Sequence, residues 1–151
     1  MIYIQLISIV VFLFGVSFVS GANLLQLFNL ESILALLLVT IPTVFASGHQ
    51  KNIFLGVKIL KNKNKQYTLE ELKNAGDSLK LLMIIVFLCA FCITVIGIIG
   101  IIYNLSDKIY LSQNLVLAFI PLFYSALFIL VIVPMYSRII IMQNKAFGLE
   151  Y

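Results

Sequence analysis

Hydrophobic positions along the chain gather into four long runs separated by polar segments. The runs cover residues 2–20, 32–48, 80–103 and 114–134. A helix needs roughly 20 mostly apolar residues to cross a bilayer, so the pattern predicts four transmembrane helices. The longest polar segment, residues 49–79, predicts a cytoplasmic loop. The expected fold class is an all-α integral membrane protein, with a single four-helix membrane domain over residues 1–151.

The third and fourth helices are expected to be longer than a membrane requires. Thr68-Leu-Glu-Glu71 is a capping box, in which a Thr and a Glu three residues apart bind the free amides of a helix start. No helix breaker follows, so one helix is predicted from Leu69 to Tyr103. At 1.5 Å per residue it would measure roughly 50 Å, against ~30 Å for the hydrocarbon core. Both helices are therefore expected to extend into the cytoplasm.

Three prolines lie inside the apolar runs and predict kinks. Pro42 is in the second run, and Pro121 and Pro134 are in the fourth. A proline inside a helix removes one backbone hydrogen bond and displaces the carbonyl four residues earlier. In a membrane, nearby hydroxyl groups can bind the freed backbone groups, and Thr40 and Thr43 flank Pro42. A moving hinge is the alternative to a fixed kink.

Polar residues mark the ends of the runs. Glu31 and Ser32 suit the N-terminus of the second helix, where free amides and the helix dipole favour oxygen atoms. Residues 105–113 are expected to form the turn between the third and fourth helices. His49 follows the second run beside several lysines, and is interpreted as a solvated interface residue rather than a ligand or proton relay.

Composition and charge agree with a membrane location. Of 151 residues, 62% are hydrophobic and 11% are charged, whereas about a quarter are charged in an average soluble domain. Seven of the ten Lys and Arg residues lie between Lys51 and Lys80. Basic residues beside spans set orientation and meet anionic lipid headgroups, so a nucleic-acid partner is not expected. Four spans place every basic residue except Lys108 on the side of both termini, which predicts that this side is cytoplasmic.

The interiors of the four apolar runs carry no Asp, Glu, Lys, Arg or His, and Lys80 stands at the edge of the third run. Transporters and proton relays usually hold such groups within the membrane, so a small exporter or a holin-like protein has little support. If protons cross here, another subunit must supply the carboxylate. Cys89 and Cys92 have no nearby His and no second pair, and are interpreted as small hydrophobic residues rather than a metal or redox site. No enzyme, cofactor or metal site is predicted.

Small and hydroxyl residues predict a packing face on the third and fourth helices. Ala90, Thr94 and Gly97 follow one another at i+4 and i+3, and small residues let membrane helices approach closely. Thr94 can bond its own backbone or point at a partner. On the fourth helix, Ser125 lies beside Tyr124, whose hydroxyl needs a hydrogen-bond partner in an apolar span.

Short motifs follow one another along the chain. They are Gly21, Phe28, Glu31-Ser32 and Ala46-Ser47-Gly48 around the second run, Ile93-Thr-Val-Ile-Gly97 and Tyr103-Asn-Leu105 in the third, and Val133-Pro134 with Arg138 in the fourth. In this order they resemble the MotA/TolQ/ExbB family, the outer subunits of ion-driven membrane motors. The likeness is to the four-span MotA branch and covers the whole chain apart from the loop.

The resemblance implies a function, an assembly and a location. It implies an A-type, stator-like subunit of a proton- or sodium-driven complex in the bacterial cytoplasmic (inner) membrane. Five copies would surround a dimer of MotB/ExbD-like partners, each with a single span that carries the ion-binding Asp. Thr94 falls on the family's third-span Thr, and Thr94, Gly97, Tyr124 and Ser125 are predicted to face the partner or line the ion pathway.

A second function stays open beside ion transport. Ile93 stands where the family has the first Gly of its third-span motif, and Pro121 stands at its fourth-span Thr. These differences favour the alternative, a non-conducting membrane scaffold or assembly protein of the same fold. The loop is also far shorter than the domain with which motility members grip a rotor, so flagellar torque is not expected.

Overall fold

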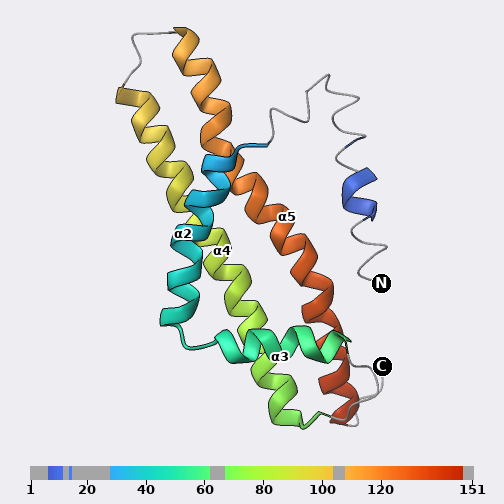
Figure 1. Cartoon of the computed structure of the whole chain (residues 1–151). Helices are drawn as coiled ribbons and strands as arrows, with labels where there is room; N and C mark the ends of the chain where they lie inside the picture. Colours follow the sequence, from blue (N-terminus) through green and yellow to red (C-terminus); the bar gives the residue numbers. More distant parts are fainter. Residues whose placement is uncertain (1–6, 12–13, 15–27, 62–66, 104–107, 148–151) are drawn as a thin grey trace.

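The described part of the chain is helical. The computed structural model describes residues 7–11, 14, 28–61, 67–103 and 108–147, which form helices and short connections without a strand among them (Figure 1). Two of the described helices are long and apolar enough to cross a membrane, α4 (Leu69–Tyr103) and the segment Asn114–Ala146 of α5 (Lys108–Ala146). The all-helical fold class is thus confirmed. That the chain has four membrane spans stays a prediction.

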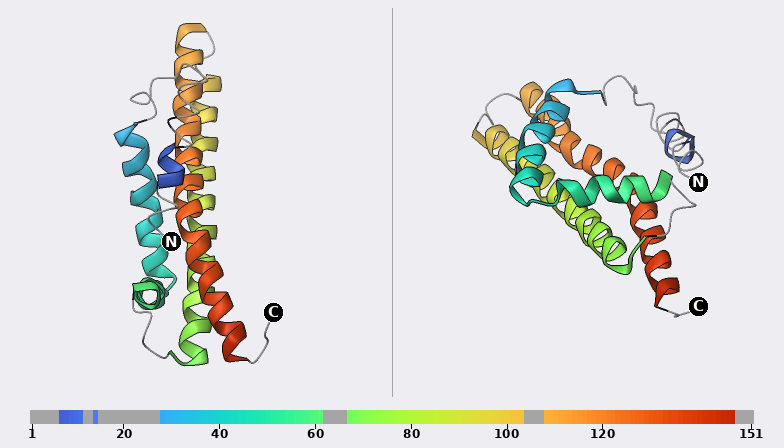
Figure 2. Two further views of the ribbon diagram at one scale, coloured as in Figure 1. Left: turned by 90° about the vertical axis from the view of Figure 1, so that its right-hand side faces the viewer. Right: turned by 60° about the horizontal axis from the view of Figure 1, so that its bottom comes forward.

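α4 and α5 form an antiparallel pair and lie side by side over their lengths (Figures 1 and 2). They contain 35 and 39 residues, so each exceeds the ~30 Å thickness of a hydrocarbon core by roughly 20 Å or more. The predicted bounds of α4 are confirmed, as is its capping box. The amide of Thr68 donates to Oε2 of Glu71 at 2.9 Å, and the amide of Glu71 donates to Oγ1 of Thr68 at 3.2 Å.

α5 is longer than the fourth apolar run in both directions. It begins at Lys108, so residues 108–113, predicted to be part of a turn, are helical instead. It also passes through Pro121 and Pro134 and ends at Ala146. Hydropathy predicted only the apolar part of this helix. Its first turns are polar and its last turns contain both polar and apolar residues, so neither belongs to the apolar run.

α2 (Leu30–Ala46) and α3 (Gln50–Lys61) meet at a sharp bend. α2 covers the second run but starts two residues before the predicted residue 32, because Oδ1 of Asn29 caps the helix by accepting from the amide of Ser32 at 3.0 Å. α3 turns away by 101°. Gly48 lies between them with φ of 71°, a left-handed conformation that favours glycine.

α3 lies within residues 49–79, which were predicted to be a loop, and forms a helix there instead. It packs against α4 and α5 near the start of α4, and in the left view of Figure 2 it is seen end-on at the foot of α2. Ile59 of α3 is 1% exposed and joins a core built from three helices. The buried members of this core are Ile59, Leu72, Ala75, Leu79, Ile132 and Ile139.

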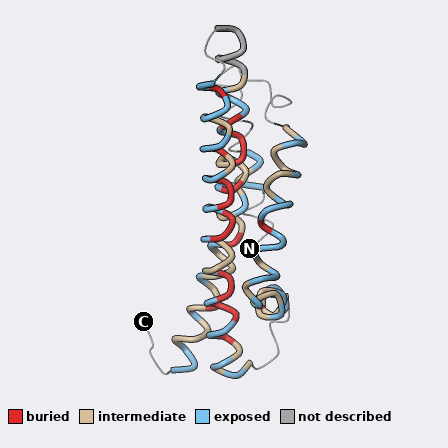
Figure 3. The backbone as a smooth tube through the Cα atoms, turned by 90° about the vertical axis from the view of Figure 1, so that its left-hand side faces the viewer, coloured by how far each residue is buried: buried red, intermediate tan, exposed pale blue. Residues whose placement is uncertain are grey.

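Burial elsewhere is confined to the faces between helices. Buried positions recur along the α4–α5 pair, whereas exposed positions recur on its outer surfaces (Figure 3). One exposed apolar stripe on α4 consists of Ile84, Leu88, Phe91, Val95, Ile99 and Ile102. Such a surface is suited to lipid or to other subunits rather than to water.

The first apolar run, predicted to span the membrane over residues 2–20, falls mostly outside the described residues. Residues 7–11 are helical, and the side chains of Ile7, Val10, Val11 and Phe14 are exposed. The prediction of a first membrane helix therefore stays a prediction.

Candidate functional site

A cavity of about 390 Å³ lies where α2 begins, between the last turns of α4 and the first half of α5. Its polar lining comes from Asn29, Glu31, Ser32 and Asn114. The remaining lining is apolar and includes small residues, namely Ala35, Ile93, Gly97, Gly100, Ile101, Leu117, Ala118 and Pro121. Glu31 is the sole carboxylate in this lining, so the cavity offers one acidic group at the end of the bundle away from α3.

Gly97 determines how closely α4 approaches α5 beside the cavity. A Cβ atom built on Gly97 would lie 3.1 Å from Cβ and 3.4 Å from Cα of Ala118. The distance to Cβ is shorter than usual for a methyl group, and the distance to the backbone Cα is at the lower limit of ordinary contact. The missing side chain thus permits the close approach of two membrane helices that small residues were predicted to provide. Gly100, one turn further, has no atom within 4 Å of the corresponding position.

Tyr124 connects α5 to the start of α2. Its hydroxyl oxygen accepts a hydrogen bond of 2.8 Å from the backbone amide of Asn29, which is also a cavity residue. The Tyr124 hydroxyl was predicted to need a hydrogen-bond partner in its apolar span. The backbone of the same chain supplies this partner.

Thr94 is buried, and its hydroxyl group is not hydrogen-bonded to any described residue. The residue is 3% exposed, and within the described part of the chain Oγ1 has no hydrogen-bond partner. The same holds for Thr40 on α2, which is 8% exposed. A helical threonine commonly donates to the carbonyl one turn earlier, as Thr43 does to Val39 at 2.7 Å. A buried hydroxyl without a partner costs about 1–3 kcal/mol.

Ser125 is also buried, at 1% exposed, but its hydroxyl donates to the carbonyl of Leu122 at 2.8 Å. Of the four predicted site residues, Gly97 alone lines the cavity, and Tyr124 adjoins it through Asn29. Thr94 and Ser125 lie inside the helix packing of one copy of the chain. That these four residues face a partner or an ion stays a prediction.

Polar contacts at the opposite end of the bundle join the helices around α3. Nδ1 of His49 lies 2.9 Å from Oγ of the fully buried Ser78, so His49 is engaged with α4 rather than simply solvated. Nε2 of Gln143 donates to the carbonyl of Leu72 at 2.7 Å. Gly76 allows this contact, since a Cβ there would lie 3.1 Å from Nε2 of Gln143.

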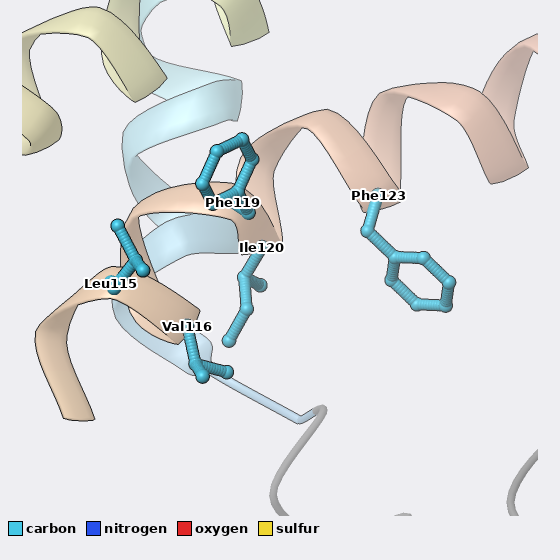
Figure 4. A pocket seen from close by; sticks show the side chains of 5 residues that line it. All are labelled: Leu115, Val116, Phe119, Ile120 and Phe123. Carbon is cyan, nitrogen blue, oxygen red and sulfur yellow. The ribbon is translucent and has the colours of Figure 1, made fainter. Parts of the chain in front are cut away.

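A second hollow, of about 350 Å³, is an apolar groove on α5 (Figure 4). Its lining comes from one helix, from Leu115, Val116, Phe119, Ile120 and Phe123. Because none of these side chains is polar, the groove can pack against apolar groups but has no group that could bind an ion or take part in catalysis. Among the described residues, no three His, Cys, Asp or Glu side chains gather to form a metal site. On α4, Cys89 is buried and Cys92 is exposed.

These features define a helical protein with two helices of membrane length and a small polar cavity between three helices. No family model, curated protein or solved structure matches the chain.

Proposed function

We propose that this protein is the A-type subunit of an ion-driven complex in a bacterial cytoplasmic membrane. Several copies, five by the family's pattern, would surround a single-span partner that supplies the ion-binding acid. The observation that carries the proposal is the α4–α5 pair, whose apolar part holds no charged side chain and whose outer faces are apolar and exposed. Within its apolar part such a pair has no acid of its own, so an ion that crosses there needs an acid from another chain.

The order of motifs that resembles the MotA branch adds support, as does the length of α4 and α5. In the proposed topology four spans cross the membrane, and the first turns of α4 and the last turns of α5 extend into the cytoplasm with both termini. The chain's own contribution would be to exclude water around the partner and to offer hydroxyl groups. Thr94 is the leading candidate, because its buried Oγ1 has no hydrogen-bond partner among the described residues.

The test is coexpression with a single-span protein that carries a membrane Asp, followed by purification in mild detergent and counting of subunits. We expect a ring with more copies of this chain than of the partner, and proton or sodium flux in proteoliposomes that requires the partner's Asp. A lone monomer that binds no such partner would overturn the proposal.

A second candidate is a non-conducting scaffold of the same fold. The observation that favours it is that folding alone accounts for two predicted site residues. Ser125 bonds its own helix, and Tyr124 holds the start of α2. For the scaffold we expect the same ring without ion flux, so the flux measurement separates the two functions.

A further inference from the structure

α3 has the geometry of a helix that lies in the plane of a membrane surface. It makes an angle of 101° with α2, so if α2 crosses a bilayer, α3 runs nearly parallel to its surface (Figure 1). Two contacts hold it there. A Cβ on Gly56 would lie 3.2 Å from Cδ1 of Leu79, and His49 at the bend contacts Ser78.

α3 crosses α4 at the level where the sequence of α4 changes from charged to apolar. Every charged residue of α4 lies between Leu69 and Lys80, and residues 81–103 carry none. Leu79, the residue that meets Gly56, therefore stands at the boundary between the polar turns and the apolar part. If the apolar part of α4 occupies the hydrocarbon core, α3 lies at the height of the lipid headgroups.

The side chains of α3 fit this position. Ile59 is turned toward the core and is 1% exposed, whereas Phe54 and Val57 are 68% and 48% exposed. Lys51 and Lys58 are exposed, seven residues apart and hence on one side of the helix. α3 contains three lysines and no acidic residue. A helix with exposed aromatic and aliphatic side chains beside lysines is typical of helices that lie in the interface of anionic membranes.

We infer that α3 is an interfacial anchor, which inserts Phe54 and Val57 at the level of the lipid headgroups and binds anionic lipid through Lys51 and Lys58. The occupant of this surface is lipid, because its positive charge complements anionic headgroups and its apolar side chains match the acyl boundary. The inference needs α2 and α4 to cross a membrane, and does not need the protein to move ions.

The chain contains no Trp, so single substitutions to Trp give depth reporters in the full-length protein. Phe54→Trp reports on α3. Phe91→Trp, at an exposed position within α4, is the deep reference, and Phe147→Trp, just beyond the end of α5, is the aqueous reference. In phosphatidylcholine–phosphatidylglycerol vesicles we expect Phe54→Trp to emit between the two references, and to be quenched most by lipids brominated near the headgroup.

Three other results would overturn the inference. They are emission and iodide quenching of Phe54→Trp like those of Phe147→Trp, strongest quenching by deeply brominated lipids, and protection from both quenchers, which would mean that protein covers the helix. Quenching of Phe91→Trp by deep bromines shows independently that the protein is inserted, whatever the outcome of a flux measurement.

The lysines are tested by replacing Lys51 and Lys58 with Gln and measuring association of spin-labelled phosphatidylglycerol in phosphatidylcholine nanodiscs. We expect association to weaken about fivefold for each lysine removed, the effect of one basic residue close to a charged membrane surface. Lys145→Gln, in the last turn of α5, is the matched control and should change nothing. Equal association for all variants would refute the role of the lysines.

Discussion

At the scale of single residues, removal of the Thr94 hydroxyl tests whether Thr94 has a functional role or only a structural one. Val has nearly the same shape as Thr but no hydroxyl, so Thr94→Val removes an unpaired polar group from a buried site. We expect the free energy of unfolding to stay constant or to rise by up to about 1–3 kcal/mol. If Thr94 serves the ion pathway, ion flux should fall nonetheless.

Thr40→Val is the matched control for this substitution. Thr40 is also buried without a hydrogen-bond partner among the described residues, but it lies on α2, outside the predicted pathway. We expect the same change in thermal unfolding and unaltered flux. Flux that is unaffected by Thr94→Val would show that the proposed role of Thr94 is wrong, whatever the effect on stability.

Gly97 provides a test of helix packing. Gly97→Ala places a methyl group 3.1 Å from Cβ of Ala118, and the nearby backbone cannot rotate away. We expect a loss of about 1–3 kcal/mol, as is typical of overpacking, measured by thermal unfolding in detergent. Adding Ala118→Gly should restore stability, because it removes the atom that clashes. Gly100→Ala, with open space around it, should not destabilise the protein.

At the scale of elements, local signals predicted α4 well. The capping box determined its start, and the continuous apolar run placed its end at Tyr103. α3 was not predicted, because its stability depends on contacts between residues distant in sequence. Ile59, for example, packs in one core with Leu72 and Leu79. Its alternation of lysines with apolar residues was the one local signal that an amphipathic helix was present. The hydrogen bond between Tyr124 and Asn29 likewise joins residues 95 positions apart, which no local pattern indicates.

The bend between α2 and α3 depends on one residue. Gly48 has φ of 71° and nothing within 4 Å of an added Cβ, so the effect of Gly48→Ala comes from backbone conformation alone. We expect a loss of about 1–2 kcal/mol, the cost of a left-handed conformation for a residue with a Cβ, in thermal unfolding. Gly100→Ala again serves as the control, since Gly100 has the same open surroundings without a positive φ. Equal stability of the two variants would contradict the assigned role of Gly48.

At the scale of the whole molecule, the long pair and α3 give the bundle two different ends. One end holds the polar cavity with Glu31, and the other holds α3, the charged first turns of α4 and the core. Because most basic residues lie at the second end, we expect it to face the cytoplasm. Hydropathy and charge predicted that basic residues gather on one side of the apolar runs, and the side of the membrane that this end faces stays a prediction. They did not predict the cavity, because its polar residues come together only through the packing of α2 on α4 and α5.

The orientation can be measured with single cysteines in a variant in which Cys89 and Cys92 are replaced by Ala. Glu31 and Asn74 are both exposed, and they lie at opposite ends of the bundle. We expect a membrane-impermeant maleimide to label Glu31→Cys in intact cells, and to label Asn74→Cys only after the cytoplasmic membrane is permeabilised. Labelling of Asn74→Cys from outside would reverse the orientation and place α3 on the outer surface. In that case both termini would also lie outside, and the proposed topology would have to be abandoned.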